Sequence, residues 1–373
     1  MHITLCTDGI FPHAMGGMQR HSRLLAEHLA RSGKVKLTVI HPHKEQVFDA
    51  ALGIDEVRVE DIDRDKFYLR ELWRYSDRVG KELQRLKPDV ILSQGFCVWK
   101  GIDRFSDRLV VHPHGLEMFQ MLTRKERIMG WPFRTALRYI LRHSKFCVSL
   151  GGKLTGILQQ QVEGSACEVV VIPNAVEVPA APAAEQRTTN LLQPAFLFVG
   201  RFAFNKGLDV LMSVAGRLAA EGKESLVRFQ LAGDGPLLAH YQEKGLPANV
   251  ELLGRVDDQR LQQLYGQCTA FILPTRFEGM PTVVLEAMVH AKPIIVSDVG
   301  ATAELVTPHN GYLLPPGDAG ALYDAVVAFA ERSWEVRAQM GAYSYQRVNE
   351  LFTWPAVARK FVGLFEQVID TAR

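Results

Sequence analysis

Short apolar segments alternate with amphipathic helical patterns along almost the whole chain, and this alternation limits the possible folds more than any other feature. Helical patterns such as Leu208–Ala220 and Asp258–Cys268 separate the apolar segments. Strands that alternate with helices form parallel sheets with crossover helices, so the sequence predicts an α/β fold. The strand candidates are His2–Thr7, Lys36–His41, Asp89–Ser93, Leu109–His112, Phe146–Leu150, Val169–Ile172, Phe196–Gly200, Arg228–Ala232, Val250–Leu253, Ala270–Leu273 and Pro293–Ser297.

The length of 373 residues predicts two domains, because single hydrophobic cores rarely grow beyond about 250–300 residues. Residues 176–194 are rich in proline, alanine and polar residues and show little periodicity, which is typical of a linker. We therefore expect Rossmann-like, doubly wound domains at 1–175 and 195–353, followed by a helical tail at 354–373. Open α/β sheets bind ligands at the carboxyl ends of their strands, so two facing sheets would line one cleft.

The composition excludes several other classes of protein. Hydrophobic residues make up 47% and charged residues 23% of the chain, as in ordinary globular proteins. The net charge of +2 argues against a nucleic-acid partner. We find neither an apolar run long enough to span a bilayer nor a signal-peptide pattern at the start. Five scattered cysteines predict reduced, buried thiols and a cytoplasmic location.

The segment Phe277–Glu286 carries the most specific chemical signal. Glu278 stands in a loop, Gly279 allows backbone to approach a ligand closely, and Pro281 suits the first position of a helix that contains Glu286. A helix start attracts phosphate through its unpaired N–H groups, and carboxylates beside it accept hydrogen bonds from hydroxyls. The pattern therefore favours a ligand with both hydroxyls and phosphate, such as a nucleotide-sugar.

Arg201 and Lys206 lie between a predicted strand and a predicted helix, in Gly200–Gly207. Two solvated surface cations are the simplest interpretation. Their position at a helix start favours binding of a diphosphate instead, because arginine offers a fork of donors and lysine a compact charge.

Three further loops follow predicted strands. Gly16-Gly17 precedes a helix expected from about Gln19, and it is neither a dinucleotide fingerprint nor a P-loop. Gly233 lies in a Gly-Asp-Gly-Pro stretch that could be only a tight turn, and Arg255-Val256 follows the next strand. Each loop could hold a nucleotide through backbone groups.

The combination of these motifs resembles a known family. G-R-x4-K-G at 200–207, G-D-G-P at 233–236, L-G-R-V at 253–256 and P-x3-E-G-x-P-x3-L-E-A-M at 274–288 are similar, in order and spacing, to the retaining glycosyltransferases of family 4. The resemblance implies the GT-B fold, in which two Rossmann-like domains face each other across a cleft. The first half resembles the family more loosely, through Gly16-Gly17 and residues 114–117.

The resemblance implies a role for each candidate residue. Arg201 and Lys206 would bind the donor diphosphate, Glu278 the donor sugar near C3 and C4, and Glu286 the ribose hydroxyls. Gly17 would meet the phosphate from the first domain, and the helix at 354–373 would pack back on that domain. The remaining donor-binding candidates are Gly16, Gly233, Arg255, Val256, Gly279, Met280, Pro281 and Thr282.

His114 is the remaining catalytic candidate. His112 and His114 at the end of a strand point the same way, but a metal site needs a third ligand and the spacing shows none. The resemblance places His114 beside the donor sugar, where it could bind a hydroxyl. Asp61, Asp63 and Asp65 fit a metal-binding D-x-D pattern, but we interpret them as a solvated loop. We expect neither a metal nor a cofactor.

Residues 124–143 mix basic side chains with Trp131, Phe133, Leu137, Ile140 and Leu141. Such a segment can lie on an anionic membrane surface. It can equally be a helix whose apolar side is buried in the core. Both interpretations stay open, because acceptors in the family are often linked to lipids.

Together these observations predict a retaining, metal-independent hexosyltransferase. It would move a sugar from a nucleoside diphosphate sugar, with UDP-sugars favoured, to a hydroxyl of a glycan or lipid-linked acceptor in polysaccharide or lipopolysaccharide biosynthesis. We expect it in the cytoplasm or peripherally on the inner face of the plasma membrane. The alternatives are another GT-B enzyme, such as a sugar-nucleotide epimerase, and a non-catalytic subunit that binds nucleotide-sugars. A phosphorylase is disfavoured because no lysine context for pyridoxal phosphate is evident.

Overall fold

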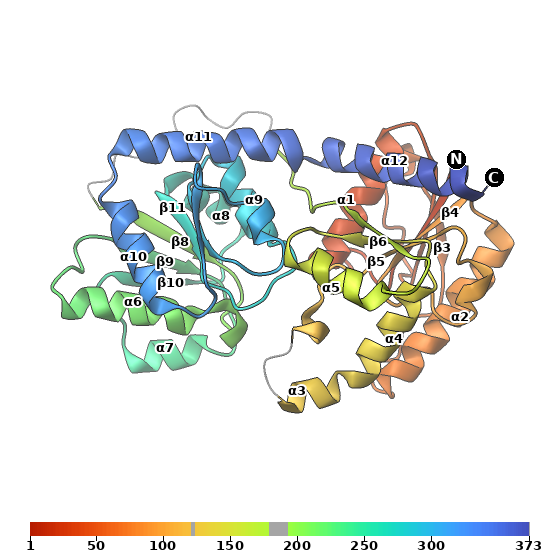
Figure 1. Ribbon diagram of the computed structural model, residues 1–373, viewed down its shortest axis with the longest axis horizontal. Coiled ribbons are helices and arrows are strands. Elements are labelled where there is room, and N and C mark those ends of the chain that lie inside the picture. Colours follow the sequence, from red (N-terminus) through yellow and green to blue (C-terminus); the bar gives the residue numbers. More distant parts are fainter. Residues whose placement is uncertain (121–123, 179–192, 373) are drawn as a thin grey trace. The chain divides into compact units, whose positions relative to one another are not determined.

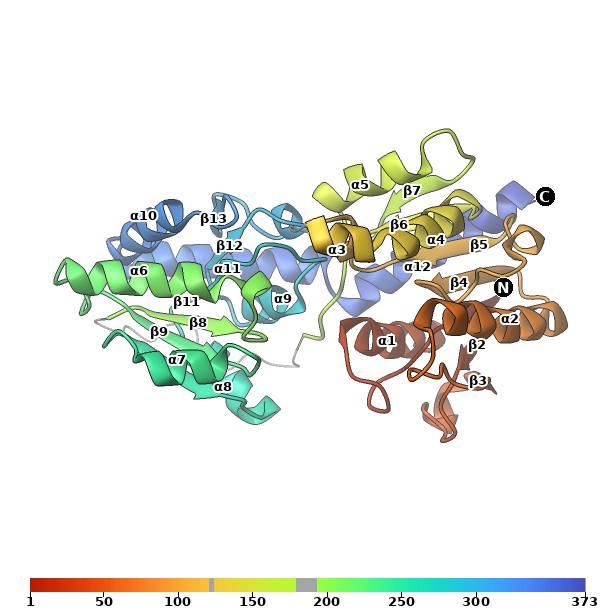
Figure 2. The ribbon, with the colours of Figure 1, turned by 90° about the horizontal axis from the view of Figure 1, so that it is seen from below.

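The computed structural model describes residues 1–120, 124–178 and 193–372. The chain divides into two compact units (Figures 1 and 2): unit 1 is Met1–Ala175 with Trp354–Arg373, and unit 2 is Val176–Thr353. Most of the proposed linker, residues 179–192, lies outside the described residues. Each unit contains one parallel sheet with helices, so the predicted α/β class is confirmed.

Unit 1 contains a seven-stranded parallel sheet in the order β3-β2-β1-β4-β5-β6-β7. The strand order reverses between β1 and β4, which is where open α/β sheets bind ligands. The strands are β1 His2–Cys6, β2 Lys36–His41, β3 Asp55–Arg58, β4 Val90–Gln94, β5 Leu109–His112, β6 Phe146–Ser149 and β7 Glu168–Val171. The five strands between the edge strands β3 and β7 are almost continuously buried, which is typical of a sheet covered on both faces.

The helix α12 joins the start and the end of the chain in one core. It packs beside α1 (Figure 1). Its side chains Trp354, Phe361 and Phe365 are buried in one core with Leu25 and Leu29 of α1. Trp354 and Pro355 are the first residues of this helix. The helices of unit 1 are α1 Gly17–Arg31, α2 Tyr68–Leu86, α3 Arg124–Met129, α4 Trp131–Arg142, α5 Lys153–Val162 and α12 Trp354–Ala372.

Unit 2 contains a six-stranded parallel sheet in the order β10-β9-β8-β11-β12-β13, which reverses between β8 and β11. The strands are β8 Ala195–Val199, β9 Arg228–Ala232, β10 Val250–Gly254, β11 Ala270–Leu273, β12 Ile294–Ser297 and β13 Gly311–Leu314. The helices are α6 Leu208–Ala220, α7 Leu238–Lys244, α8 Asp258–Gln267, α9 Thr282–Val289, α10 Ala319–Ala330 and α11 Trp334–Leu351. The helix α10 packs beside α6, and α11 packs beside α9.

All five cysteines are buried and none forms a disulfide. None of the described helices combines the length and the apolar composition that a bilayer span would require.

Candidate functional site

The loops after β8, β9 and β10 are joined to one another at the carboxyl edge of the sheet in unit 2. Gly233 N donates a hydrogen bond to the carbonyl of Gly254 at 2.8 Å, and Phe202 N donates to the backbone carbonyl of Asp234 at 2.8 Å. Gly233 must be glycine, because a Cβ there would lie 1.9 Å from the Gly200 carbonyl oxygen. Together the loops line a cavity of about 360 Å³, whose lining includes Gly200, Arg201, Gly233, Asp234, Arg255 and Val256.

Lys206 and Glu278 form an ion pair in unit 2. Lys206 lies in a 3₁₀ turn, Phe204–Lys206, and its Nζ donates to Glu278 Oε1. Thr275 Oγ1 lies 3.3 Å from the same oxygen. Glu278 Oε2 has no partner among the described residues and stays available to a ligand hydroxyl. Lys206 is thus bound to the acid that follows β11, although the sequence alone suggested only a phosphate partner.

Arg201 is an exposed cation of this edge, as is Arg255. Arg201 lines the cavity beside Gly200, and its guanidinium has no hydrogen bond or ion pair with any described residue. A fork of five donors in such a position suits a diphosphate.

Two contacts that the sequence did not reveal fix the loop that carries Glu278. Arg276 pairs with Asp209 of α6 through two contacts of 2.7 and 2.6 Å, and this hydrogen bonding lowers the pKa of Asp209. Gly300, after β12, lies against the carbonyl oxygens of Glu278 and Gly279. Ala301 N donates to the Gly279 carbonyl at 2.9 Å. In the sequence, the only sign of the contact between Gly300 and the Glu278 loop is that a glycine follows the strand β12.

We expect Gly300→Ala to weaken donor binding at least tenfold. A Cβ at this position would lie 2.2 Å from the Glu278 carbonyl oxygen, so the loop must move. The backbone at φ +54° adds strain of about 1–3 kcal/mol to any residue other than glycine. Gly317→Ala is the matched control, because Gly317 has φ +78° but a Cβ added there would meet no heavy atom within 4 Å. Calorimetric titration with nucleotide should separate the variants, and equal affinities would show that Gly300 does not position the loop.

The helix α9 begins at Thr282, one residue later than predicted. Pro281 is its N-cap, with φ −71° and ψ 115°, instead of its first helical residue. No side chain of a described residue caps this helix start, and the unpaired N–H groups of a helix start can bind an anion. Met280 is buried, which leaves its backbone as the group that can contact a ligand.

Glu286 lies within α9 and accepts a hydrogen bond from the Tyr265 hydroxyl at 2.9 Å. Burial raises the pKa of Tyr265 well above its ordinary value, so the hydroxyl stays protonated and keeps donating. Tyr265 comes from α8 and was not predicted. It holds the carboxylate that the resemblance assigns to the ribose.

In unit 1, the helix α1 begins at Gly17, earlier than the expected Gln19. Gly16 is its N-cap and has φ 152° and ψ 166°. A Cβ added to Gly17 would meet no heavy atom within 4 Å, so the backbone there borders open space. This geometry permits close approach of a ligand to Gly17 without identifying the ligand.

His114 follows β5 in unit 1 with φ 60°, an uncommon conformation for a residue that is not glycine. Its Nε2 lies within hydrogen-bonding distance of Gln94 Oε1. Burial first, and then the rings of His112 and His21, hold the pKa of His114 well below its ordinary value. The imidazole is therefore neutral at pH 7 and can exchange hydrogen bonds without carrying charge.

His21 of α1 supplies the third histidine that the sequence spacing did not show. One ring nitrogen from each of His21, His112 and His114 lies within 4.8 Å of the others. The rings of His112 and His114 are stacked, with centroids 3.8 Å apart and planes at 25°. Imidazole lone pairs lie in the ring plane, so those of two stacked rings lie in nearly parallel planes, an arrangement that disfavours a shared ion. The absence of a metal requirement remains a prediction.

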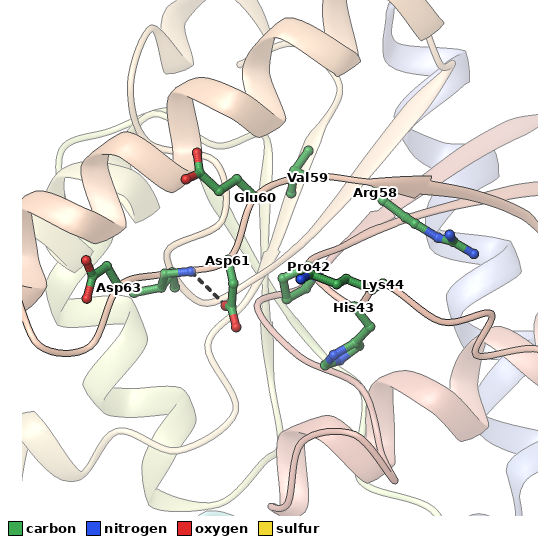
Figure 3. Close-up of a pocket in the computed structure, with 9 residues that line it drawn as sticks. Pro42, His43, Lys44, Arg58, Val59, Glu60, Asp61 and Asp63 are labelled. Carbon is green, nitrogen blue, oxygen red and sulfur yellow. Dashed lines mark hydrogen bonds between the residues drawn. The ribbon is translucent and has the colours of Figure 1, made fainter.

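A second cavity, of about 520 Å³, lies in unit 1 beyond the ends of β2 and β3 (Figure 3). Asp61 and Asp63 line it, and their carboxylates point in different directions. Asp63 pairs with Lys66 at 2.5 Å, while Asp61 accepts a hydrogen bond from the backbone of Ile62 at 2.7 Å. The two acids therefore do not form a converging metal site.

The helices α3 and α4 divide the segment 124–143 into a buried and an exposed part. Leu137, Ile140 and Leu141 are buried, so the core-helix interpretation is correct for these three. Ile128 and Trp131 are 75% and 64% exposed. The exposed apolar surface therefore lies around the junction of α3 and α4.

Two family models match the chain. Glycosyltransferase Family 4 matches residues 15–178, and Glycosyl transferases group 1 matches residues 193–332. The chain belongs to the family 4, group 1 glycosyltransferases. The first match covers most of unit 1, and the second contains every candidate residue of unit 2.

Curated relatives match this family 4 chain over part of their length. O-antigen chain mannosyltransferase C of Escherichia coli is 28% identical over 184 residues, which are 47% of each chain. Phosphatidyl-myo-inositol mannosyltransferase of Mycobacterium leprae is 28% identical over 212 residues, or 56% of each chain. The matches thus span about half the length of these relatives.

Solved structures match over nearly the full length. Sucrose-phosphate synthase from Thermosynechococcus elongatus gives a TM-score of 0.81 at 21% identity, with 99% of each chain covered. HepE of Anabaena, in complex with UDP and glucose, gives a TM-score of 0.65 at 16% identity, with 98% of this chain and 99% of that chain covered. These similarities confirm the predicted GT-B fold.

Proposed function

We propose that this protein transfers a sugar from a nucleoside diphosphate sugar to a hydroxyl acceptor and retains the anomeric configuration. The observation that carries the proposal is the grouping in unit 2 of an anchored Glu278, a free Arg201 and an uncapped helix α9. Glu278 is complementary to a sugar, and the other two groups are complementary to a diphosphate. Membership of the glycosyltransferase family supports the same activity.

The chemistry requires charge stabilisation at the leaving group. Negative charge grows on the diphosphate as the C1–O bond breaks, and preorganised donors there usually supply the largest share of the rate enhancement. Arg201 and the N–H groups of α9 fit this role, with Lys206 shared between phosphate and Glu278. We assign Glu278 to the sugar hydroxyls, so retention would come from front-face attack in which a diphosphate oxygen takes the acceptor proton. The resemblance adds Gly17 and neutral His114 as donor contacts.

The donor and acceptor classes are inferred from relatives. HepE was solved with UDP and glucose, which supports a UDP-sugar donor. The E. coli relative is named for the O-antigen chain and the M. leprae relative for a phosphatidylinositol, which supports a cell-envelope or lipid-linked acceptor.

A thermal-shift panel of UDP, GDP and ADP, each with its sugars, tests the donor assignment. A ligand at 100 times its dissociation constant should stabilise the protein by about 2.7 kcal/mol. We expect one nucleoside diphosphate and its sugar to stabilise the protein far more than the others. No shift with any of them would contradict the proposed donor site.

Two alternatives make different predictions. A sugar-nucleotide epimerase would convert the donor without an acceptor, so product identification separates it from a transferase. A non-catalytic subunit would bind the donor without any turnover. The pairing of Lys206 with Glu278 and the free Arg201 favour catalysis, because they place charge where a leaving group needs it.

Activity should persist in EDTA. Arg201, Lys206 and α9 can neutralise the diphosphate, the carboxylates of Asp61 and Asp63 point in different directions, and the stacking of His112 on His114 disfavours a shared ion. The measurement is the transfer rate before and after chelation, with added Mg²⁺ or Mn²⁺ as the control. A complete loss that either ion restores would contradict metal independence.

We also predict that the junction of α3 and α4 binds anionic membranes. Ile128, Met129 and Trp131 are exposed, and Arg124 and Lys125 add charge beside them. Each basic residue near an anionic surface contributes about 1 kcal/mol of attraction. Replacing the three apolar residues by serine, or both cations by glutamate, should reduce co-sedimentation with phosphatidylglycerol vesicles.

The control for membrane binding is Trp334→Ser, which removes a 51% exposed tryptophan from unit 2. Arg134, Arg138 and Arg142 are unsuitable targets, because their guanidiniums donate hydrogen bonds to Met118, Gln161 and Glu163, respectively. Equal sedimentation of all variants would leave the junction without a membrane role.

A further inference from the structure

A third cavity, of about 470 Å³, lies in unit 1 between the loop that follows His114 and the helices α3 and α4. Three arginines surround it. No carboxylate is among the described residues that line it, which are Met118, Phe119, Gln120, Arg127, Arg134 and Arg138. We call this the arginine pocket.

The protein holds two of the three guanidiniums in place, those of Arg134 and Arg138. Arg134 donates to the carbonyl of Met118 at 3.2 Å and to the carbonyl of Arg127, which ties α4 to the loop and to α3. Arg138 Nε donates to Gln161 Oε1 at 2.9 Å. Arg138 thereby keeps its terminal nitrogens for other partners, and the guanidinium of Arg127 has no hydrogen bond or ion pair with any described residue.

The arginine pocket brings three like charges together. Arg134 and Arg138 are four residues apart on α4, where like charges repel. Arg127 brings a third positive charge to the same cavity. A phosphate group would relieve the repulsion, because its oxygens match the planar fork of donors that a guanidinium presents. The Nε2 of Gln120, a residue that lines the pocket, is buried and has no hydrogen-bond partner among the described residues.

We infer that the arginine pocket binds a phosphate group of the acceptor substrate. This inference rests on the proposed function and narrows its acceptor to a phosphate-bearing molecule. The loop Met118–Gln120 follows His114 directly at the carboxyl edge of the sheet, so a phosphate held there anchors the acceptor in the unit that carries His114. The phosphate belongs either to a lipid or to a water-soluble sugar or polyol, and both present the same chemistry to the three arginines.

Direct binding tests the inference without requiring turnover. The full-length chain with Lys206→Ala, which weakens the donor phosphate site, is titrated with glycerol 3-phosphate in a calorimeter. Arg127→Gln or Arg138→Gln in this background should weaken binding about tenfold or more, as expected for loss of a charge-assisted hydrogen bond. Arg124→Gln is the matched control, since it removes the same charge from α3 outside the pocket lining.

The control also defines the contradicting results. If Arg124→Gln weakened the binding of glycerol 3-phosphate as much as Arg127→Gln, the loss would be due to general surface charge. That result would overturn the inference. Absence of binding by the parent chain to both glycerol 3-phosphate and the lipid below would overturn it as well. Arg127→Lys keeps the charge and loses the fork, so it should bind with intermediate affinity.

A matched lipid distinguishes the two sources of phosphate. Phosphatidic acid in phosphatidylcholine vesicles presents the glycerol 3-phosphate headgroup on a membrane. Comparable dependence on Arg127 in both assays supports recognition of the phosphate from either source, and dependence in the vesicle assay alone supports a lipid source. If the protein bound phosphate in this pocket but transferred no sugar, the proposed function would be wrong and the pocket would still be a phosphate site. Failure of the proposed function can thus be distinguished from failure of this inference.

Discussion

Glu278→Gln should lower the turnover of the donor by about 10²–10³-fold, because a sugar misplaced by about 1 Å already costs about 10²-fold. In the structure Glu278 accepts from Lys206 and Thr275 through one oxygen, and the other oxygen is left for a sugar hydroxyl. Glutamine keeps the size of the side chain and one acceptor, so the free energy of unfolding should change by less than about 1.5 kcal/mol. Initial rates at saturating donor, measured alongside thermal unfolding, check both expectations.

Asp298→Asn is a control for Glu278→Gln, since it neutralises another acid at a strand end of the same sheet. Turnover by Glu278→Gln close to that of the unaltered protein would contradict the role in sugar binding. A large loss of stability together with activity would instead show that the ion pair with Lys206 is mainly structural.

Arg201→Ala and Lys206→Ala should each weaken binding of the nucleoside diphosphate by about 10–150-fold, which corresponds to about 1.5–3 kcal/mol for a charge-assisted hydrogen bond. The nucleoside without phosphate should bind to both variants as it binds to the unaltered protein. Lys206→Ala should also lower turnover more than Arg201→Ala, because it removes the ion-pair partner that holds Glu278. Calorimetric titration with nucleoside and with nucleoside diphosphate measures the difference.

Lys244→Ala removes an exposed cation from the end of α7 and serves as the control for these two variants. If Arg201→Ala lost affinity for the nucleoside as strongly as for the diphosphate, the cavity would hold the base against Arg201 and the phosphate assignment would be wrong.

The local pattern of apolar and polar residues was sufficient to predict most of the helices and strands. The predicted helix Leu208–Ala220 and strand Ala270–Leu273 have the predicted bounds, because long amphipathic periodicity and buried apolar runs are strong local signals. The strands β3 and β13 were missed. Each has only four residues, and Asp55–Arg58 is mostly charged because it lies at the edge of its sheet.

The parts of the site that were missed depend on contacts between distant elements. Tyr265 reaches Glu286 from α8, Asp209 reaches Arg276 from α6, and Gly300 supports the Glu278 loop from the end of β12. None of these residues belongs to a local motif, so only the packed sheet brings them together. His21 joins His112 and His114 for the same reason.

The anomeric configuration of the first product tests the central claim most directly. Hydrolysis or transfer of an α-linked nucleoside diphosphate sugar is followed by proton NMR during the first turnovers, before the free sugar equilibrates. We predict that the α-configured sugar appears first and that Glu278→Gln abolishes its appearance. A β-configured first product would contradict a retaining glycosyltransferase. Binding of a donor that is not turned over with any of the phosphate-bearing acceptors tested would contradict it as well.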